Sequence, residues 1–416
     1  MTPVEGTAFV VATVVKVVGF FTLLLVVTGL CTYIERRVAG FIQDRSGPNR
    51  VGPVGILQVL ADGLKFILKE EVAPQGANRP FFYLAPALAL VPATVLFAVI
   101  PFASPLPTEW GLVELIVADV PIGFLYILAI ASLGVYGVVM AGWSSNSKYS
   151  FLGGLRGSAQ MISYEIALAM SLVPLLLLAG NVTLPELVSM QQSYAEGPVT
   201  WGVWFVIPLL LASFLFFVSS LAETNRLPFD LPEAETELVG GYHTEYSSMK
   251  FGLFFLGEYA HLVTTGALVA VFFLGGWDIP FWEGDNVRVL ADGTVIGEPT
   301  WWKSLLTGGV FMAKTLGVVL VFMWIRWTLP RFRYDQLMNL GWKVFLPLLM
   351  IYIMLMATLI YALDAAGWTT GPAYALVLGG VNLLLMVVLV FAIDRGLLIR
   401  GAAYRGPIVR PSAEES

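Results

Sequence analysis

The densest group of ionisable side chains in this sequence lies in one segment, AETNRLPFDLPEAETELVGGYHTEYSSMKFG, at about 222–252. Its acidic residues outnumber its basic residues, Arg226 and Lys250; they are Glu223, Asp230, Glu233, Glu235, Glu237 and Glu245. Glu233 and Glu237 are four residues apart, so on a helix they would share a face and raise at least one carboxyl pKa. Apolar residues are interleaved with the acids. This pattern favours a functional role over a merely solvated acidic loop.

A second polar segment, at about 33–82, contains a stretch with helical periodicity at 55–70. The apolar side chains that fall on one face are Leu57, Leu60, Leu64, Ile67 and Leu68, and those on the opposite face are Gln58, Asp62, Lys65 and Lys69. The stretch is too short and too charged to span a bilayer. It predicts an amphipathic helix at the membrane surface, which could serve a site or act only as an anchor.

A third group of ionisable residues falls within strongly apolar stretches: Lys16, Glu165, Glu258, His261 and Lys314. Charged groups at membrane depth are costly unless they pair or face water, so they are candidates for function. Glu258 and His261 are three residues apart and share a helix face. The two lysines could instead snorkel or pair with an acid, and Glu165 could make a polar contact between helices.

These side chains are embedded in a composition that is typical of membrane proteins. The chain has 416 residues, of which 57% are hydrophobic and 12% charged, and its mean hydropathy is +0.80; soluble domains carry about 25% charged residues. The net charge of −6 argues against nucleic acid as a partner. With one cysteine, Cys31, and two histidines, we expect no disulfide framework, no metal site and no cofactor held by this chain.

The apolar stretches predict an all-α, polytopic transmembrane helix bundle, because a span needs about 20 apolar residues. Nine spans are expected, at 8–32, 83–103, 121–143, 160–180, 201–222, 252–275, 305–325, 343–363 and 373–393. The first does not read as a cleaved signal peptide, since it lacks a basic segment before it and Glu35-Arg36-Arg37 follow it. We therefore expect one transmembrane domain over 1–394 and a basic cytoplasmic tail over 395–416.

The basic residues between the spans predict an orientation. Eighteen lysines and arginines fall on one side of a nine-span topology, whereas Arg288 and Lys303 fall on the other. The positive-inside rule then places the N-terminus outside and the two polar segments in the cytoplasm.

Two motifs are similar to the signatures of a known family. The run at 55–65, GILQVLADGLK, and the run at 228–238, PFDLPEAETEL, followed by Gly240-Gly241, resemble those of the H-type membrane subunit, or subunit 1, of bacterial respiratory complex I, the proton-pumping NADH–quinone oxidoreductase. Glu35-Arg36-Arg37 and the run at 331–337, RFRYDQL, are also similar. The resemblance covers roughly 10–363, so the ninth span and the tail lie beyond it.

The resemblance implies a subunit in the bacterial cell membrane that forms the membrane side of a quinone chamber. FMN and iron–sulfur clusters would belong to hydrophilic partner subunits, and antiporter-like membrane subunits would be further partners. Residues implied to line or shape the chamber are Glu35, Arg36, Arg45, Asp62 and Lys65. Residues implied to link quinone reduction to proton translocation are Glu223, Glu233, Glu235 and Glu237, with Glu165, Glu258 and His261 inside the membrane. Family members can carry a further glutamate in the third span, but 121–143 contains none.

Other functions stay open from the sequence. The homologous membrane subunit of an energy-converting hydrogenase would share the motifs without using quinone. A stand-alone ion-coupled transporter would place its polar groups in broken helices at the midplane, and often shows internal repeats, whereas here the charges gather in loops. A non-catalytic assembly anchor is a third alternative. The residues do not distinguish ubiquinone from menaquinone.

Overall fold

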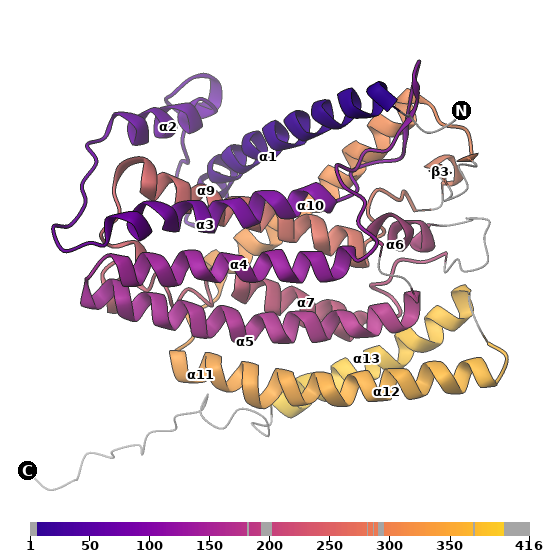
Figure 1. Ribbon diagram of the computed structural model, residues 1–416. Coiled ribbons are helices and arrows are strands. Elements are labelled where there is room, and N and C mark those ends of the chain that lie inside the picture. The colour runs from indigo at the N-terminus through magenta and orange to yellow at the C-terminus, as the bar shows by residue number, and fades with distance from the viewer. Residues whose placement is uncertain are drawn as a thin grey trace, which may run out of the picture.

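The computed structural model describes residues 6–180, 183–192, 202–280, 282–285, 287–289, 295–368 and 371–394. Long helices lie side by side and run in alternating directions along the bundle (Figure 1). Eight helical segments of the described chain are long and apolar enough to cross a membrane. They are α1 (Gly6–Ile42), α3 (Arg79–Leu96, extended by a 3₁₀ turn at Phe97–Val99), α4 (Gly123–Ser144), α5 (Lys148–Ala179), α9 (Ser248–Phe273), α10 (Trp301–Thr328), α11 (Tyr334–Asn339) continued through a π-helical turn (Leu340–Phe345) into α12 (Leu346–Ala365), and α13 (Pro372–Asp394). The prediction of an all-α membrane bundle is confirmed.

The fifth predicted span, 201–222, differs in the structure. Its helix, α7 (Leu210–Glu223), has 14 residues, about 21 Å at 1.5 Å per residue, which is less than the roughly 30 Å of a hydrocarbon core. Residues 202–209 form turns instead. Pro208 has no backbone N–H to donate, so a regular helix does not continue back through it. Sequence hydropathy could not show this break, because the residues on both sides of it are apolar.

Buried amide side chains satisfy the backbone at this break. Gln191, at the end of α6 (Leu184–Gln191), accepts from the backbone N–H groups of Phe205 at 3.1 Å and Gly275 at 3.0 Å. Asn382 of α13 is fully buried, donates to the carbonyl of Pro208 at 2.8 Å and accepts from the Tyr352 hydroxyl at 2.6 Å. Unpaired backbone groups are costly in an apolar environment, so these amides allow irregular backbone inside the bundle.

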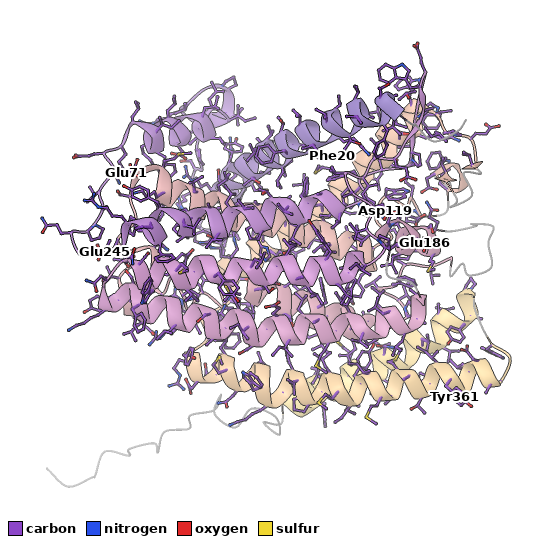
Figure 2. All side chains as sticks on the ribbon, in the orientation of Figure 1. Phe20, Glu71, Asp119, Glu186, Glu245 and Tyr361 are labelled. Atoms are coloured by element: carbon purple, nitrogen blue, oxygen red, sulfur yellow. The ribbon has the colours of Figure 1, made fainter. Side chains whose placement is uncertain are left out.

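One end of the bundle, hereafter the basic end, carries the short helices α2 (Gln58–Leu68) and α8 (Glu235–Leu238) with a 3₁₀ turn at Gly241–His243. It lies at the left of Figure 1, and Figure 2 shows Glu71 and Glu245 there. The helix predicted at 55–70 is thus shorter, and a separate 3₁₀ turn at Pro53–Gly55 precedes it. No described residue of α2 is buried, and the apolar side chains Leu60, Leu64 and Ile67 are more than half exposed.

The opposite end carries α6 and two small antiparallel hairpins, β1–β2 (Leu106–Thr108, Gly111–Val113) and β3–β4 (Arg288–Val289, Val295–Ile296). Figure 2 shows Asp119 and Glu186 at this end. Here the Lys314 ammonium caps the end of α9 by donating to three carbonyls, those of Leu274 at 2.6 Å, Gly276 at 3.0 Å and Asp278 at 2.6 Å. A cation on the free carbonyls of a helix C-terminus is favourable.

Exposed tryptophans mark two levels along the bundle. Trp301 and Trp302 begin α10 at the opposite end, and Trp324 lies in its last turns at the basic end. The 22 residues from Trp302 to Trp324 span about 33 Å, close to the thickness of a bilayer core. Tryptophan gathers at membrane interfaces, so these positions fit a multi-pass membrane protein. Which end faces the cytoplasm stays a prediction, and the predicted tail at 395–416 lies outside the described residues.

Candidate functional site: a buried charge cluster between two cavities

Arg226, in the loop between α7 and α8, is the centre of the site. Its side chain is 1% exposed. Its Nη1 donates to Glu35 Oε2 of α1 at 2.7 Å, and its Nε lies 2.9 Å from Glu258 Oε1 of α9. The guanidinium also stacks over the Tyr259 ring, 4.2 Å from its centroid. One loop residue therefore ties together two helices that are more than 200 residues apart in sequence.

Glu35 is held by two further groups. The Tyr259 hydroxyl donates to its Oε2 at 2.7 Å, and Arg326 Nη1 of α10 contacts its Oε1. Glu35 is 4% exposed, so its charge is stabilised by these partners and not by water. Two carboxylates and two guanidinium groups make the cluster neutral when all four are ionised, which is the arrangement that makes buried charges tolerable.

The loop that follows Arg226 brings two more carboxyl groups beside this cluster. Asp230 pairs with Arg331 at 2.8 Å, yet burial raises the pKa of Asp230 to about 6 against that favourable charge. Glu233 has no arginine or lysine partner among the described residues. Burial, and then the nearby carboxylates of Glu258 and Asp230, raise the pKa of Glu233 well above its ordinary value.

The two polar neighbours of Glu233 are uncharged, so they favour its protonated carboxyl group over its carboxylate. The Tyr242 hydroxyl lies 3.3 Å from Glu233 Oε1, and His243 Nδ1 lies 3.8 Å away. Burial lowers the pKa of His243 to about 4, so its ring is neutral at physiological pH. Glu233 therefore has no arginine or lysine in direct contact among the described residues, and it is well placed to take up and release a proton.

The loop itself is fixed from two sides. Gln160 of α5 is fully buried, and its amide donates to the carbonyls of Ala222 at 2.7 Å and Phe229 at 2.6 Å, on either side of Arg226. From the other side, the backbone N–H of Phe332 donates to the carbonyl of Pro228 at 3.1 Å. These bonds anchor a short irregular segment that has few backbone bonds of its own.

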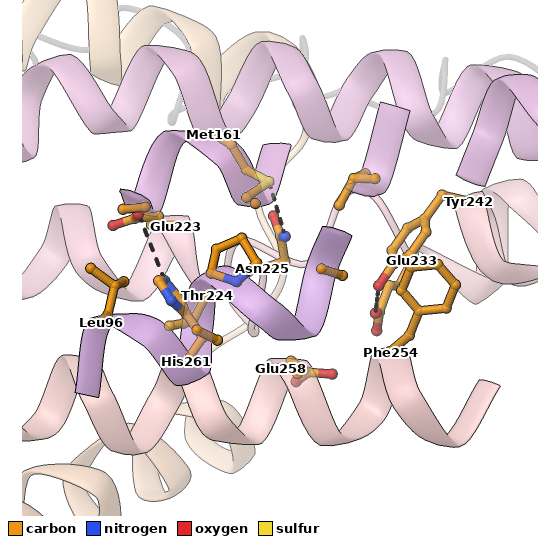
Figure 3. Close-up of a pocket in the computed structure, with 17 residues that line it drawn as sticks. Leu96, Met161, Glu223, Thr224, Asn225, Glu233, Tyr242, Phe254, Glu258 and His261 are labelled. Atoms are coloured by element: carbon orange, nitrogen blue, oxygen red, sulfur yellow. Dashed lines mark hydrogen bonds and ion pairs between the residues drawn. The ribbon is translucent and has the colours of Figure 1, made fainter. Parts of the chain in front are cut away.

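A small cavity of about 60 Å³, hereafter the inner cavity, lies beside the cluster among α3, α4, α5 and α9 (Figure 3). Its polar lining residues are Glu223, Thr224, Asn225, Glu233, Tyr242, Glu258 and His261. Figure 3 shows Glu223 and His261 at one end of this set and Glu233 with Tyr242 at the other. The volume is sufficient for a few water molecules and too small for an organic substrate.

A larger cavity of about 670 Å³, hereafter the entrance cavity, lies between α1, α2 and the first half of α9. Its polar lining includes Arg36, Asp62 and Lys65, and its apolar lining includes Phe66 and Phe255. Tyr259 also lines this cavity, and the same side chain donates to Glu35. The entrance cavity is therefore one hydrogen bond from the buried charge cluster.

Known proteins are similar to this chain over most of its length. A profile of the family described as NADH dehydrogenase matches residues 15–357. The first NADH-quinone oxidoreductase H subunit of Geobacter metallireducens is 47% identical over 339 residues, which cover 82% of this chain and 93% of the relative. The chain belongs to the H-subunit family of NADH–quinone oxidoreductase.

Other members of the H-subunit family are similar over the same extent. The NADH-quinone oxidoreductase H subunit of Rhodospirillum centenum is 46% identical over 351 residues, covering 84% of this chain and 94% of the relative. The first H subunit of Cytophaga hutchinsonii is 45% identical over 356 residues, covering 85% and 97%. The family predicted from the two motifs is confirmed, and the profile match ends before α13.

Most residues predicted for the chamber gather at the entrance cavity. Arg36 donates through Nη1 to Asp62 Oδ2 at 2.6 Å. Lys65 Nζ lies 3.6 Å from Asp62. Glu35 lies behind Tyr259 in the charge cluster. Arg45 does not line the entrance cavity and donates to Gln43 at 2.6 Å.

The glutamates implied to link quinone reduction to proton translocation do not all lie together. Glu233 lies before α8, which begins at Glu235, so Glu233 and Glu237 do not share a helix face as their spacing predicted. Glu237 is 48% exposed and pairs with Arg156 at 2.6 Å. The pKa of Glu233 rises through burial and through Glu258 and Asp230, which corrects the expected cause. The side chain of Glu235 lies outside the described part of the chain.

Two of the residues implied to lie inside the membrane, Glu258 and His261, line the inner cavity together with Glu223. Glu165, on α5, makes no hydrogen bond or ion pair with the described residues and does not line either cavity.

Sequence reasoning missed several side chains that build the site: Arg226, Arg326, Tyr259, Tyr242, His243 and Gln160. Arg226 and Arg326 counted only as positive charges between spans. The one pattern that could have suggested Arg226 is its place in a segment with three times as many acids as bases.

Proposed function

We propose that the chain is the membrane subunit of a proton-translocating NADH–quinone oxidoreductase and forms the membrane side of its quinone chamber. Quinone is the substrate, and flavin and iron–sulfur clusters belong to hydrophilic partner subunits. Further partners are antiporter-like membrane subunits in the bacterial cell membrane. The names of the relatives support this reading over an energy-converting hydrogenase, because those names specify quinone.

The observation that carries the proposal is the position of Tyr259. Its side chain lines the entrance cavity and donates to Glu35, whose other partners are Arg226 and Arg326. The cavity, at about 670 Å³, is within the range of organic-ligand sites, roughly 300–1,000 Å³. Its apolar walls between the helices suit an isoprenoid tail. Its polar pair, Arg36 and Asp62, suits a ring that forms hydrogen bonds.

The charge cluster supports a route from quinone reduction to proton transfer. Reduction of a quinone uses two electrons and two protons and creates negative charge beside the protein. That charge would weaken the ionised form of Glu35 and shift Arg226 between its two carboxylate partners, Glu35 and Glu258. Glu258 lies beside Glu233, so the shift would change the proton affinity of Glu233 at the inner cavity.

The test is Tyr259→Phe in the assembled complex, with Tyr136→Phe as the matched control because Tyr136 is 58% exposed on α4. Tyr259→Phe should raise the KM for a short-chain quinone about tenfold, the effect of one lost buried hydrogen bond to a charged group. NADH oxidation by an artificial acceptor that reacts before the quinone site should not change. Unchanged quinone kinetics in an assembled Tyr259→Phe complex would contradict the proposal.

A further inference from the structure

The start of α9 holds the C-terminal end of α2. The Ser248 hydroxyl lies 3.0 Å from the carbonyl of Phe66 and 2.8 Å from the carbonyl of Lys69, and it can donate to either. The last carbonyls of a helix lack partners within the helix, so this hydroxyl supplies a bond that α2 cannot make for itself. The neighbouring Ser247 hydroxyl accepts from the backbone N–H of Val72 at 2.9 Å. Ser247 and Ser248, hereafter the α2 anchor, therefore bind the end of α2 and the chain that follows it.

Ser248 has a backbone conformation that few residues other than glycine adopt. Its φ is +56°, in the left-handed region, where a residue with a side chain is strained. The residue is 6% exposed, and it lines the entrance cavity together with Ser247. Strained residues persist where the surrounding structure holds them, and they gather at active sites and ligand clamps. A serine in a conformation that favours glycine indicates that the position requires the hydroxyl group.

A buried lysine strengthens the α2 anchor. Lys250 is 5% exposed, and its Nζ lies 2.7 Å from Glu71 Oε1 in the segment that follows α2. The same Nζ lies over the rings of Tyr83 and Phe82 of α3, 3.8 and 4.9 Å from their centroids. A cation over aromatic rings is held more strongly when water is excluded. The segment after α2 is thus tied to α9 and α3 at once.

The other end of α2 depends on contacts that water reaches. Tyr33 and Arg37 of α1 donate to the carbonyl of Val54 at 2.8 and 2.6 Å, and both bonds are exposed. The pair between Arg36 and Asp62 is exposed as well. Exposed pairs contribute little because water competes for them. Figure 1 shows α2 outside the row of long helices, and none of its residues, all of which the structure describes, is buried. The position of α2 is therefore set mainly at its C-terminal end.

We propose that Ser248 is a positioning residue for the substrate of the entrance cavity, because it holds α2 against α9 and so fixes the wall that α2 contributes. That this substrate is a quinone rests on the proposed function. With the anchor in place, the cavity is formed before the substrate arrives. Without it, α2 is displaced in a fraction of the molecules, and the apparent affinity falls in proportion while the bound complex is the same. Loss of the anchor therefore raises KM and spares kcat.

The first test compares Ser248→Gly with Ser248→Asn in the assembled complex. Glycine and asparagine both tolerate a φ of +56°, but only asparagine keeps a side-chain donor. Ser248→Gly should raise the KM for a short-chain quinone about fivefold with kcat unchanged, the effect of one lost hydrogen bond. Ser248→Asn should recover most of this affinity. An unchanged KM in Ser248→Gly, or an equal rise in both variants, overturns the proposal.

The second test measures hydrogen exchange of the backbone amides at 65–72 in the same complexes without quinone. Ser248→Gly should exchange about fivefold faster there than the unmodified complex, with α4 as the internal reference. Lys250→Met, which leaves the Ser248 hydroxyl in place and Glu71 in contact with water, should speed exchange at 69–72. Unchanged exchange in both variants overturns the proposal. Because quinone is absent, this result is distinct from failure of the quinone-chamber proposal, which Tyr259→Phe tests.

Discussion

A buried arginine and a partly buried lysine, at opposite ends of the bundle, are neutralised in different ways. Arg226 meets carboxylates that come from α1 and α9, at 2.7 and 2.9 Å. Lys314 donates to three backbone carbonyls and lies 4.2 Å from the centroid of the Trp204 ring, with the carboxyl groups of Asp278 and Asp285 nearby. Backbone carbonyls keep their partial charge whatever the pH, whereas carboxylates gain and lose protons. The direct contacts of Arg226 can therefore gain and lose protons, whereas the hydrogen bonds of Lys314 go to groups that do not titrate.

The strongest test of this difference removes the charge of Arg226. Arg226→Met leaves the buried carboxylates of Glu35 and Glu258 without their shared partner, which should cost about 3–5 kcal/mol of stability. We expect little assembled complex in membranes, measured by native electrophoresis and thermal melting. Arg226→Lys, which keeps one positive charge but cannot reach both acids with separate nitrogens, should give an intermediate result. Normal assembly of Arg226→Met would contradict the ion-pair role.

A second test compares a buried acid with an exposed one in the same loop. Glu233→Gln should lower quinone-linked proton translocation about 100-fold, within the range of a lost acid–base group, and should spare NADH oxidation by an artificial acceptor. Glu237→Gln is the control, because Glu237 is half exposed and paired with Arg156. It should stay close to the unmodified rate. Equal loss in both variants would mean that the loop acts only as a scaffold.

The same pair of variants gives a pH test. The pKa of Glu233 is raised, so the folded protein holds this proton at pH values where an ordinary glutamate has lost it. The coupled rate of the unmodified complex should fall as the pH rises through this pKa, and Glu237→Gln should follow the same curve. Glu233→Gln should lack that fall. Linkage has the same sign, since the stability that the bound proton contributes is also lost with rising pH.

At the opposite end of the bundle, Lys314→Met should lower stability without changing the coupling of quinone reduction to proton translocation. Three carbonyls lose their donor, and the buried carboxyl groups of Asp278 and Asp285 lose a nearby positive charge, so we expect about 1–3 kcal/mol of destabilisation. The quinone-linked rate per assembled complex should not change. Lys303→Met is the control, because Lys303 binds a carbonyl at the exposed start of α10. A coupling defect in Lys314→Met would show that both ends respond to charge.

The smallest effect is expected at the entrance cavity. Arg36 is 45% exposed and makes one hydrogen bond to Asp62, so the pair should contribute less than about 1 kcal/mol. Arg36→Lys should change the affinity for a quinone-site inhibitor less than about fivefold. Lys65→Arg serves as the control for a charge-preserving change on α2. A larger change in inhibitor affinity in Arg36→Lys would mean that Arg36 contributes more binding energy than its exposure predicts.

The sequence alone predicted the bundle and its polar segments better than it predicted the contacts. Hydropathy is additive along the chain, so the long apolar stretches were visible, but it does not register a backbone break such as the one at Pro208. Helical spacing placed Glu233 beside Glu237, and this was wrong because α8 starts two residues after Glu233. An acid's neighbours in space are not given by its neighbours in sequence.

The same limit explains why Arg226 was missed. Its two acidic partners lie 191 residues before it and 32 residues after it, and nothing in their local sequences relates the three. The motif resemblance pointed to Glu35 and Glu258 individually. Only the packing of α1 against α9 makes them two ligands of one guanidinium group.

Asn382 makes an inner segment of the chain depend on its last described helix. The family profile ends at residue 357, yet the break at 202–209 that Asn382 completes lies inside it. A helix beyond the shared part of the family thus supplies bonds to a segment within that part. A chain that lacked this helix would have to satisfy the carbonyl of Pro208 and the backbone N–H of Leu211 in another way. The last described helix therefore acts as a polar brace for irregular backbone inside the bundle.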